Sequence, residues 1–235
     1  MSENTASSHT RYLKNLSIDA FNEMQSDFIE SAAKTDNIML LAPTGSGKTL
    51  AYLIPLVDAL QEDLREVQAL IIVPSRELAI QIEQVFKGMK TPFKVSTVYG
   101  GHAMKVEQNS LSEAPAVVIG TPGRLSDHVQ KESFDTQGIK MIILDEFDKS
   151  LQMGFHEQLR VIFRGLKAQT QRHILTSATV LERLPDFIPF QKPNTVNYLE
   201  EVDALADHLA IIEAGRVIAE GAPSALKAAL GGEPV

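Results

Sequence analysis

The strongest constraint on the fold of this chain is the stretch "IMLLAPTGSGKTLAYLIPL", residues 38–56. An apolar run that suits a buried strand leads into a glycine-rich loop, and an apolar helical run follows directly. Gly45 and Gly47 let the backbone curl so that successive N–H groups point inward, and the helix that starts near Lys48 adds its positive end. This stretch predicts a strand, a phosphate-binding loop and a helix, although a plain glycine turn between strand and helix is the alternative.

The loop predicts a site for a nucleoside triphosphate with Mg²⁺, and the sequence pattern gives two of its residues definite roles. Lys48 would reach the outer phosphates, and the Thr49 hydroxyl would hold Mg²⁺. ATP or ADP with Mg²⁺ is therefore the expected ligand, and no other metal is expected. The predicted nucleotide-binding residues of the loop are Ala42, Pro43, Thr44, Gly45, Ser46, Gly47, Lys48 and Thr49.

Further apolar runs alternate with helical stretches along the chain. Runs of this length that are rich in Val and Ile favour buried parallel strands, and the helical run at 76–90 has one apolar face. The sequence therefore predicts an α/β fold, a P-loop NTPase with a parallel sheet flanked by helices. Residues 1–15 are expected to be a flexible terminus. The predicted strands are 38–42, 69–74, 94–100, 116–121, 140–146 and 173–179.

A pair of acids follows another apolar run, in "MIILDEFD" at 141–148. Asp145 would meet the Mg²⁺ shell and Glu146 would accept a proton from the attacking water. The alternative is that these acids simply begin a helix, where a negative charge suits the positive end of the helix dipole. Together with the loop lysine, the pair gives Lys48, Asp145 and Glu146 as the predicted catalytic residues.

Several short motifs resemble, in order and spacing, those of the first RecA-like domain of a DEAD-box RNA helicase. The resemblance covers about residues 16–199. It is carried by "PSRELAIQ" at 74–81, the pair Gly100–Gly101, "TPGRL" at 121–125, "DEFDKSLQMGF" at 145–155 and "SAT" at 177–179. Phe147 stands where the family usually has Ala.

The resemblance implies roles for residues outside the phosphate loop. Gln25 is implied to read adenine, although "FNEM" precedes it where the family usually has Pro-Thr and two more residues, and Tyr12 is the one candidate for an aromatic that stacks on adenine. Ser177 and Thr179 are implied to couple the nucleotide state to domain closure. The residues implied to line the RNA backbone path are Arg76, Gly101, Thr121 and Arg124.

The resemblance also implies a low activity for these residues taken alone. Only 56 residues follow Thr179, counted from 179 to 235, whereas a second RecA-like domain is longer than that. An arginine finger of the kind that the second domain supplies contributes on the order of 10³–10⁵ in rate. We expect weak or no ATP hydrolysis, no unwinding, and weak binding of single-stranded RNA.

The end of the chain, about residues 200–235, is similar instead to the closing segment of ABC-transporter ATPase subunits. "GRVIAEGAPSALK" at 215–227 fits that pattern, whereas the ABC signature "LSGGQ" does not occur in the chain. The sequence therefore predicts a helix, a β-hairpin and a helix, packed on the same sheet as the helicase part. The hypothesis is a chimera, natural or engineered, and the alternative is a helicase linker with a chance likeness.

Composition limits the partners and the compartment. The chain has no Cys, so it has no disulfides or thiolate metal sites. The net charge of −8 argues against a broad polyanion-binding surface. No apolar run would span a bilayer and the polar start has no signal-peptide pattern, which favours the cytoplasm without a membrane partner. Three functions stay open: a weak ATPase, a nucleotide-binding module, and an engineered scaffold without retained nucleotide function.

Overall fold

The core of the protein is a parallel seven-stranded sheet with the strand order β3-β4-β2-β5-β6-β1-β7. The computed structural model describes residues 3–101, 103–166, 172–199, 209–213 and 216–221. All the pairings in this sheet are parallel. The strands of this sheet are β1 (Asn37–Leu41), β2 (Ala69–Ile72), β3 (Val95–Val98), β4 (Val117–Gly120), β5 (Met141–Leu144), β6 (Arg172–Ser177) and β7 (Asn194–Asn197).

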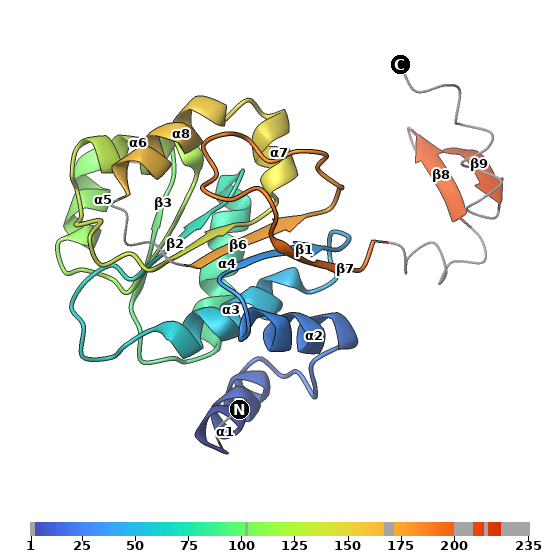
Figure 1. Cartoon of the computed structure of the whole chain (residues 1–235), viewed down its shortest axis with the longest axis horizontal. Helices are drawn as coiled ribbons and strands as arrows, with labels where there is room; N and C mark the ends of the chain where they lie inside the picture. The colour runs from blue at the N-terminus through green and yellow to red at the C-terminus, as the bar shows by residue number, and fades with distance from the viewer. Residues whose placement is uncertain (1–2, 102, 167–171, 200–208, 214–215, 222–235) are drawn as a thin grey trace.

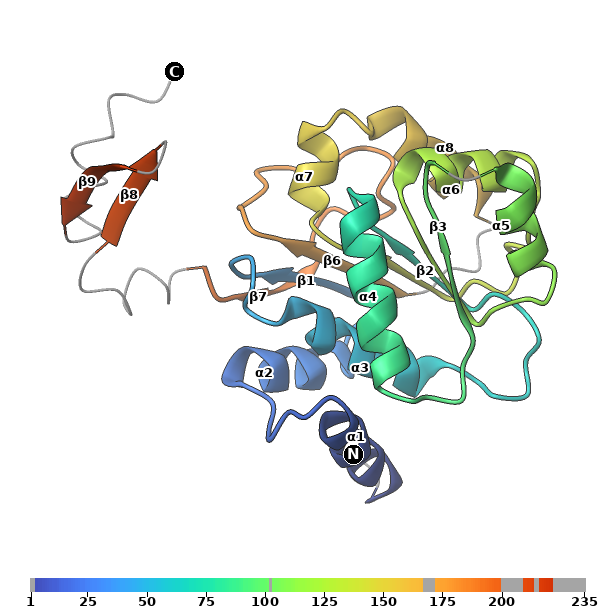
Figure 2. The same cartoon turned by 180° about the vertical axis from the view of Figure 1, so that it is seen from behind.

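Helices cover the sheet on both faces (Figures 1 and 2). Successive side chains of a strand point to opposite faces, so neighbours such as Ile71 and Ile72 belong to two separate hydrophobic clusters. Side chains of α1 to α4 contribute to one cluster and those of α5 to α8 to the other. The helices are α1 (Glu3–Asn15), α2 (Glu23–Ala32), α3 (Lys48–Ala59), α4 (Arg76–Gly88), α5 (Met104–Leu111), α6 (Pro122–Gln130), α7 (Phe147–Gln152) and α8 (His156–Gly165).

The predicted fold class is confirmed, and each of the six predicted strands is present, with β1 shifted by one residue and the other five shorter than predicted. The seventh strand, β7, was not predicted from the sequence. It pairs with β1 at the edge of the sheet, and its four residues are mostly exposed. A short polar segment carries no apolar signal, so only the pairing with β1 identifies it as a strand.

Residues 3–15 form the helix α1, where the sequence suggested a flexible terminus. Tyr12 and Leu13 are buried in the hydrophobic core, at 5% and 8% exposure. His9 pairs with Asp58 of α3 at 2.9 Å, and the Asn15 side chain donates to the Met89 carbonyl at 2.9 Å. Polar composition misled the prediction, since a few apolar residues at helical spacing suffice to dock a helix.

The predicted C-terminal hairpin is present as β8 (Leu209–Glu213) and β9 (Arg216–Gly221). The two strands pair with each other in antiparallel fashion and form a sheet of their own, separate from the seven-stranded sheet. The hairpin therefore adds no strand to the large sheet, and its packing on that sheet stays a prediction. The helices predicted on either side of the hairpin lie outside the described residues.

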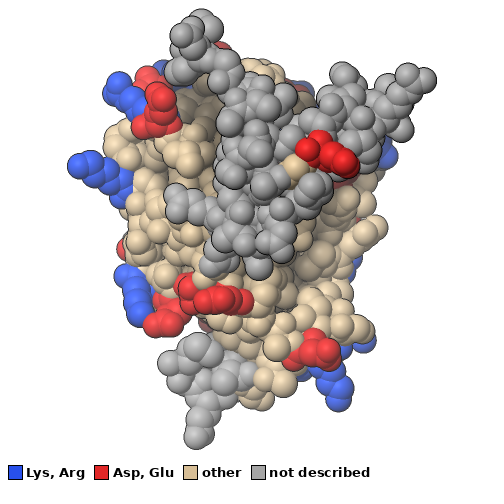
Figure 3. Space-filling model, turned by 90° about the vertical axis from the view of Figure 1, so that its right-hand side faces the viewer, with Lys and Arg blue, Asp and Glu red and all other residues tan. Residues whose placement is uncertain are grey.

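Charges of both signs occur on the side of the molecule drawn in Figure 3. Lys and Arg side chains lie around its rim together with Asp and Glu, so the described residues there do not gather into one basic field. In the part of the chain that the structure describes, no helix has both the length and the apolar character that crossing a bilayer requires.

We predict that α1 contributes to the stability of the sheet domain. Leu13→Ala removes a buried side chain from the core, so the free energy of unfolding should fall by about 2–4 kcal/mol. Urea unfolding monitored by circular dichroism measures this change. Lys14→Ala, at the exposed neighbouring position, should change it by less than about 0.5 kcal/mol. Equal effects of the two substitutions would show that α1 does not pack as described.

Candidate functional site

The phosphate loop connects β1 to α3 and has the backbone shape that a phosphate cradle needs. Gly45 and Gly47 have φ angles of +84° and +91°, in the left-handed region that favours glycine. Gly47 is also the N-cap of α3, so the loop opens onto the positive end of a twelve-residue helix. The Ser46 hydroxyl is buried and has no partner among the described residues. A donor left unpaired in such a loop is an observation that fits an oxyanion ligand.

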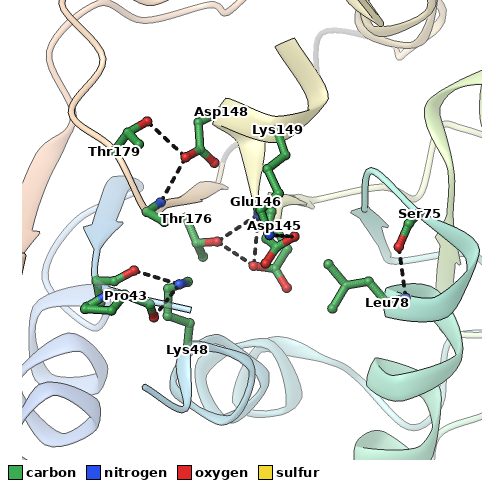
Figure 4. A network of polar contacts seen from close by, with 12 residues as sticks. Pro43, Lys48, Ser75, Leu78, Asp145, Glu146, Asp148, Lys149, Thr176 and Thr179 are labelled. Atoms are coloured by element: carbon green, nitrogen blue, oxygen red, sulfur yellow. Dashed lines mark hydrogen bonds and ion pairs between the residues drawn. The ribbon is translucent and has the colours of Figure 1, made fainter. Parts of the chain in front are cut away.

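The Lys48 side chain folds back into the loop. Its Nζ donates to the backbone carbonyl of Ala42 at 2.7 Å and to that of Pro43 at 2.8 Å, as Figure 4 shows for Pro43. Burial lowers the pKa of Lys48, and the nearby carboxylates, Asp145 first, act in the opposite direction. The ammonium group therefore stands at the loop with carbonyl partners that a phosphate oxygen could replace.

Asp145 lies at the end of β5 and is almost fully buried, at 2% exposure. Its Oδ2 accepts a hydrogen bond from the Tyr52 hydroxyl at 2.9 Å. Its Oδ1 accepts from the Thr176 hydroxyl and from the Glu146 backbone N–H. Burial raises the pKa of Asp145, and the hydrogen bonds from Thr176 and Tyr52 counteract this. The carboxylate is thus fixed in orientation before any ligand arrives.

Tyr52 is a residue of this site that the sequence analysis missed. It is fully buried one helical turn after Thr49, and burial followed by the Asp145 charge raises its pKa well above the usual value. The nearby Thr49 side chain acts on the pKa of the same hydroxyl in the opposite direction. Thr49 and Asp145, the two predicted Mg²⁺ ligands, therefore meet around one phenol oxygen. A hydroxyl and a carboxylate fit a cation that takes oxygen ligands and completes its shell with phosphate and water.

Glu146, the predicted base, has a strained backbone at the start of α7. Its φ and ψ of 48° and 50° are left-handed, which is uncommon for a residue other than glycine. Its backbone N–H donates to the Thr176 hydroxyl at 3.1 Å, and its carboxylate pairs with Lys149 at 2.9 Å (Figure 4). Strain of this kind clusters at functional sites when the surrounding structure holds it in place.

Of the two predicted coupling residues, Thr179 contacts the acid motif, and Ser177 contacts Thr179 and the phosphate loop. Asp148, 3% exposed, accepts hydrogen bonds from the Thr179 hydroxyl at 2.9 Å and from the Ala178 backbone N–H at 3.2 Å. The Ser177 hydroxyl donates to the Thr179 carbonyl, while the Ser177 backbone carbonyl accepts from the Ala42 N–H at 3.1 Å. The end of β6 is therefore bonded to both the acid motif and the phosphate loop.

Gln25 lies against the phosphate loop. Its side-chain N–H donates to the Gly47 carbonyl at 3.1 Å, and its Oε1 accepts from the Asn22 backbone N–H. Asn22 caps α2 in return and donates to the Ser46 carbonyl. Asn22 and Gln25 form a capping box, whose N-x-x-Q spacing was visible in the sequence. The adenine role of Gln25 stays a prediction. Tyr12 is part of the hydrophobic core and not an exposed stacking platform.

The four residues predicted to contact RNA follow three neighbouring strands, β3, β4 and β2. The Arg76 guanidinium lies 5.0 Å from the centre of the Tyr99 ring, and its Nη1 lies 3.5 Å from the place where Gly101 would carry a Cβ. The Thr121 N–H donates to the Val98 carbonyl at 3.2 Å. The Arg124 Nε donates to the carboxylate of Glu107, a residue that the sequence analysis did not single out.

A cavity of about 640 Å³ lies away from these residues, beside α1, α2 and α3. Phe21, Ile29 and Pro55 give it an apolar lining, and the polar side chains in it include Asp58 and His9, which contact each other. It contains none of the residues that the sequence assigned to the nucleotide or to RNA. Its size alone therefore does not make it the functional site.

The parallel sheet and the phosphate loop place this protein in the P-loop NTPase class. The sequence profile described as "DEAD/DEAH box helicase" matches residues 22–187. The chain therefore belongs to the DEAD/DEAH box helicase family. The residues after 187 are not part of that match, and it gives no support to an ABC-transporter ATPase segment.

Relatives and solved structures agree with this assignment. The DEAD-box ATP-dependent RNA helicase CshA of Bacillus licheniformis is 34% identical over 173 residues, which are 73% of this chain and 35% of that protein. The ATP-dependent rRNA helicase RRP3 of Encephalitozoon cuniculi is 34% identical, over 78% of this chain and 46% of that protein. The chain thus spans less than half the length of these two relatives.

Two crystal structures share the fold. A DEAD box protein from the hyperthermophile Methanococcus jannaschii has a TM-score of 0.68 and 32% identity, over 77% of this chain and 49% of that one. A hypothetical ATP-dependent RNA helicase from Sulfolobus tokodaii has a TM-score of 0.69 and 29% identity, over 83% of this chain and 57% of that one. Both support the RecA-like parallel sheet described above.

The two loop glycines give a matched pair of substitutions. Alanine at either position is strained by the positive φ, at a cost of about 1–2 kcal/mol. At Gly47 the new Cβ would also lie 2.5 Å from the Gln25 side chain, whereas the space around Gly45 is open. We expect Gly47→Ala to lower the free energy of unfolding more than Gly45→Ala, as measured by urea unfolding. An equal loss would argue against the contact between Gln25 and the loop.

Because Asp145 is buried, we predict that replacing it with a neutral residue stabilises the protein and that the gain depends on pH. Its pKa is raised by burial, so the folded protein favours the protonated acid, and the ionised acid lowers stability at pH values above the folded pKa. Asp145→Asn should therefore raise the free energy of unfolding at pH 7. The gain should shrink as the pH falls toward about 4, the pKa of an unfolded Asp. Chemical denaturation across this pH range measures it, and a loss of stability at pH 7 would contradict the prediction.

Proposed function

We propose that these residues form the nucleotide-binding domain of an ATP-dependent RNA helicase, which binds ATP or ADP with Mg²⁺. The observation that carries the proposal is the convergence of Lys48, Thr49 and Asp145 at the phosphate loop. Lys48 donates to the loop carbonyls, and the two predicted Mg²⁺ ligands, Thr49 and Asp145, both lie next to the Tyr52 hydroxyl. The names of the relatives support ATP and RNA as the ligands.

In this proposal each side chain has a separate task. Lys48 neutralises the outer phosphates, while the backbone N–H groups around Gly45 and Gly47 hold their oxygens. Thr49 and Asp145 would hold Mg²⁺, which would offset the charge that develops on the phosphates. Glu146 accepts the proton of the attacking water, and for this its carboxylate must exchange the contact with Lys149 for the water.

We further propose that these residues, assayed alone, hydrolyse ATP weakly and do not unwind RNA. The chain covers 35% and 46% of the two relatives described above, whose activities belong to the whole proteins. Single-stranded RNA would bind weakly through the backbone path of Arg76, Gly101, Thr121 and Arg124. Contacts to phosphates carry no sequence information, so little base preference is expected.

The origin of residues 200–235 stays a hypothesis. The likeness of "GRVIAEGAPSALK" to the end of ABC ATPases supports a chimera, and the separate hairpin β8–β9 fits a segment added to a complete sheet. If the protein is an engineered scaffold that lost its nucleotide function, it should still unfold cooperatively but not respond to nucleotide. The next experiment distinguishes a protein that still binds nucleotide from a scaffold that does not.

We predict that Mg²⁺–ADP stabilises the protein and that Lys48→Ala removes this effect. A ligand that binds only the folded state adds RT ln(1 + [L]/Kd), about 2.7 kcal/mol at a hundred times Kd. For a domain of this size that raises Tm by about 5–10 °C. The ligand-induced shift is compared within each variant by thermal melting, with the exposed Lys34→Ala as control. A sharp melt that ADP does not move in the wild type would overturn nucleotide binding.

A further inference from the structure

Glu107 of α5 is a buried carboxylate that the proposed nucleotide chemistry does not use. It is 5% exposed, yet it contacts polar groups from two parts of the fold, the turn after β3 and the helix α6. Its Oε1 accepts from the Tyr99 backbone N–H at 3.1 Å, after β3. Its Oε2 receives the Nε of Arg124 and lies 2.8 Å from the Nε2 of His128, and both of these residues belong to α6.

Glu107 controls the direction of the Arg124 side chain. The guanidinium group is a planar fork, so a charge-assisted hydrogen bond at Nε fixes the plane of the whole group. The side chains of Arg124 and Glu107 are only 14% and 6% exposed, so water screens this ion pair much less than a surface pair. Arg124 is thereby prevented from sampling the many rotamers of a free surface arginine.

The same carboxylate is also connected to Arg76, but indirectly, through Tyr99. The Tyr99 N–H is held by Glu107, and its ring lies under the Arg76 guanidinium at 5.0 Å. Gly101 follows two residues later and approaches Arg76 closely. One buried acid therefore connects the turn after β3 with α6, two of the three places that carry the predicted RNA contacts.

His128 of α6 contacts Glu107 from the buried side. It is fully buried, and its Nδ1 has no partner within the described part of the chain, so its contact with Glu107 is the polar contact that the structure gives this ring. A buried carboxylate with one arginine, one histidine and one backbone N–H around it is well satisfied. The cost of burying the acid is thereby offset by groups that it also orients.

We propose that Glu107 is a positioning residue for the binding of single-stranded RNA. It orients Arg124 directly, and Arg76 through Tyr99, toward the phosphates of one strand. This inference rests on the proposed RNA binding of the domain. A purely structural role, in which Glu107 only joins α5 to α6, predicts a different outcome in the experiment below.

The test measures binding of a fluorescent single-stranded oligouridylate to the full chain by anisotropy at several salt concentrations. Glu107→Gln should weaken binding about fivefold or more. It should also reduce the slope of log K against log salt by about 0.7, the contribution of one phosphate contact on a single strand. Glu107→Asp keeps the charge but shortens the side chain, so it should weaken binding as well.

Glu113→Gln is the matched control, because it removes a negative charge from the turn that follows α5. Glu113 is exposed and forms an ion pair with Lys94. Removing this charge should leave RNA binding unchanged or slightly stronger. If Glu107→Gln behaves like Glu113→Gln, the charge alone matters and the positioning role is overturned.

A double-mutant cycle with Arg124→Ala separates positioning from a structural role. If Glu107 acts through Arg124, Glu107→Gln should cost much less in the Arg124→Ala background than in the wild type. The same loss in both backgrounds would overturn the inference. If Glu107→Gln does not melt cooperatively, the cycle is run with Glu107→Asp. Absence of RNA binding by the wild type at low salt would instead overturn the proposed RNA function together with this inference.

Discussion

Parallel pairing of β5, β6 and β1 is the constraint on which the site depends. Parallel strands end at the same edge of a sheet, so the segments that follow them meet although they are far apart in sequence. The Ala42 N–H reaches the Ser177 carbonyl, and the Asp145 N–H reaches the Ile72 carbonyl. These hydrogen bonds continue the strand pairing just beyond the strands. They fix the point at the edge of the sheet where each functional loop begins. A shift of one residue in any pairing would exchange the two faces of that strand.

Around this edge the structure holds several groups in states that cost free energy. Lys48 and Asp145 are buried, and their pKa values are displaced by that burial in opposite directions, each toward the neutral form. Glu146 has a left-handed backbone, and the Ser46 hydroxyl has no partner among the described residues. Phosphate oxygens and a divalent cation would satisfy these groups together. The helices and the two hydrophobic clusters supply the stability that permits them.

The sequence predicted the framework well because buried strands and the phosphate loop carry local signals. Six strands, the loop and the acid pair follow from apolar runs, glycines and their spacing. β7 could not be predicted, since its polar residues become a strand only through pairing with β1. The docking of α1 depends in the same way on long-range contacts, such as that of His9 with Asp58.

The residues missed within the site share one property, which is that their partners are distant in sequence. Tyr52 and Asp145 are 93 positions apart, so nothing near Tyr52 distinguishes it from the other apolar residues of α3. Glu107 reads as one more acid on a short polar helix, until the fold brings it to Arg124 and His128. The capping box of Asn22 and Gln25 is the opposite case, since its three-residue spacing could have been recognised.

Two buried acids thus organise the carboxyl edge of the sheet in the same way. Asp145 gathers hydroxyls from α3 and β6 around the phosphate loop, and Glu107 gathers an arginine, a histidine and a backbone N–H beside the strands β3 and β4. Between them lies β2, whose end begins α4 with Arg76. Any movement of β2 relative to β4 and β5 would therefore disturb both groups. Under the proposed function, this shared strand connects the nucleotide-binding group with the RNA-binding group within one domain.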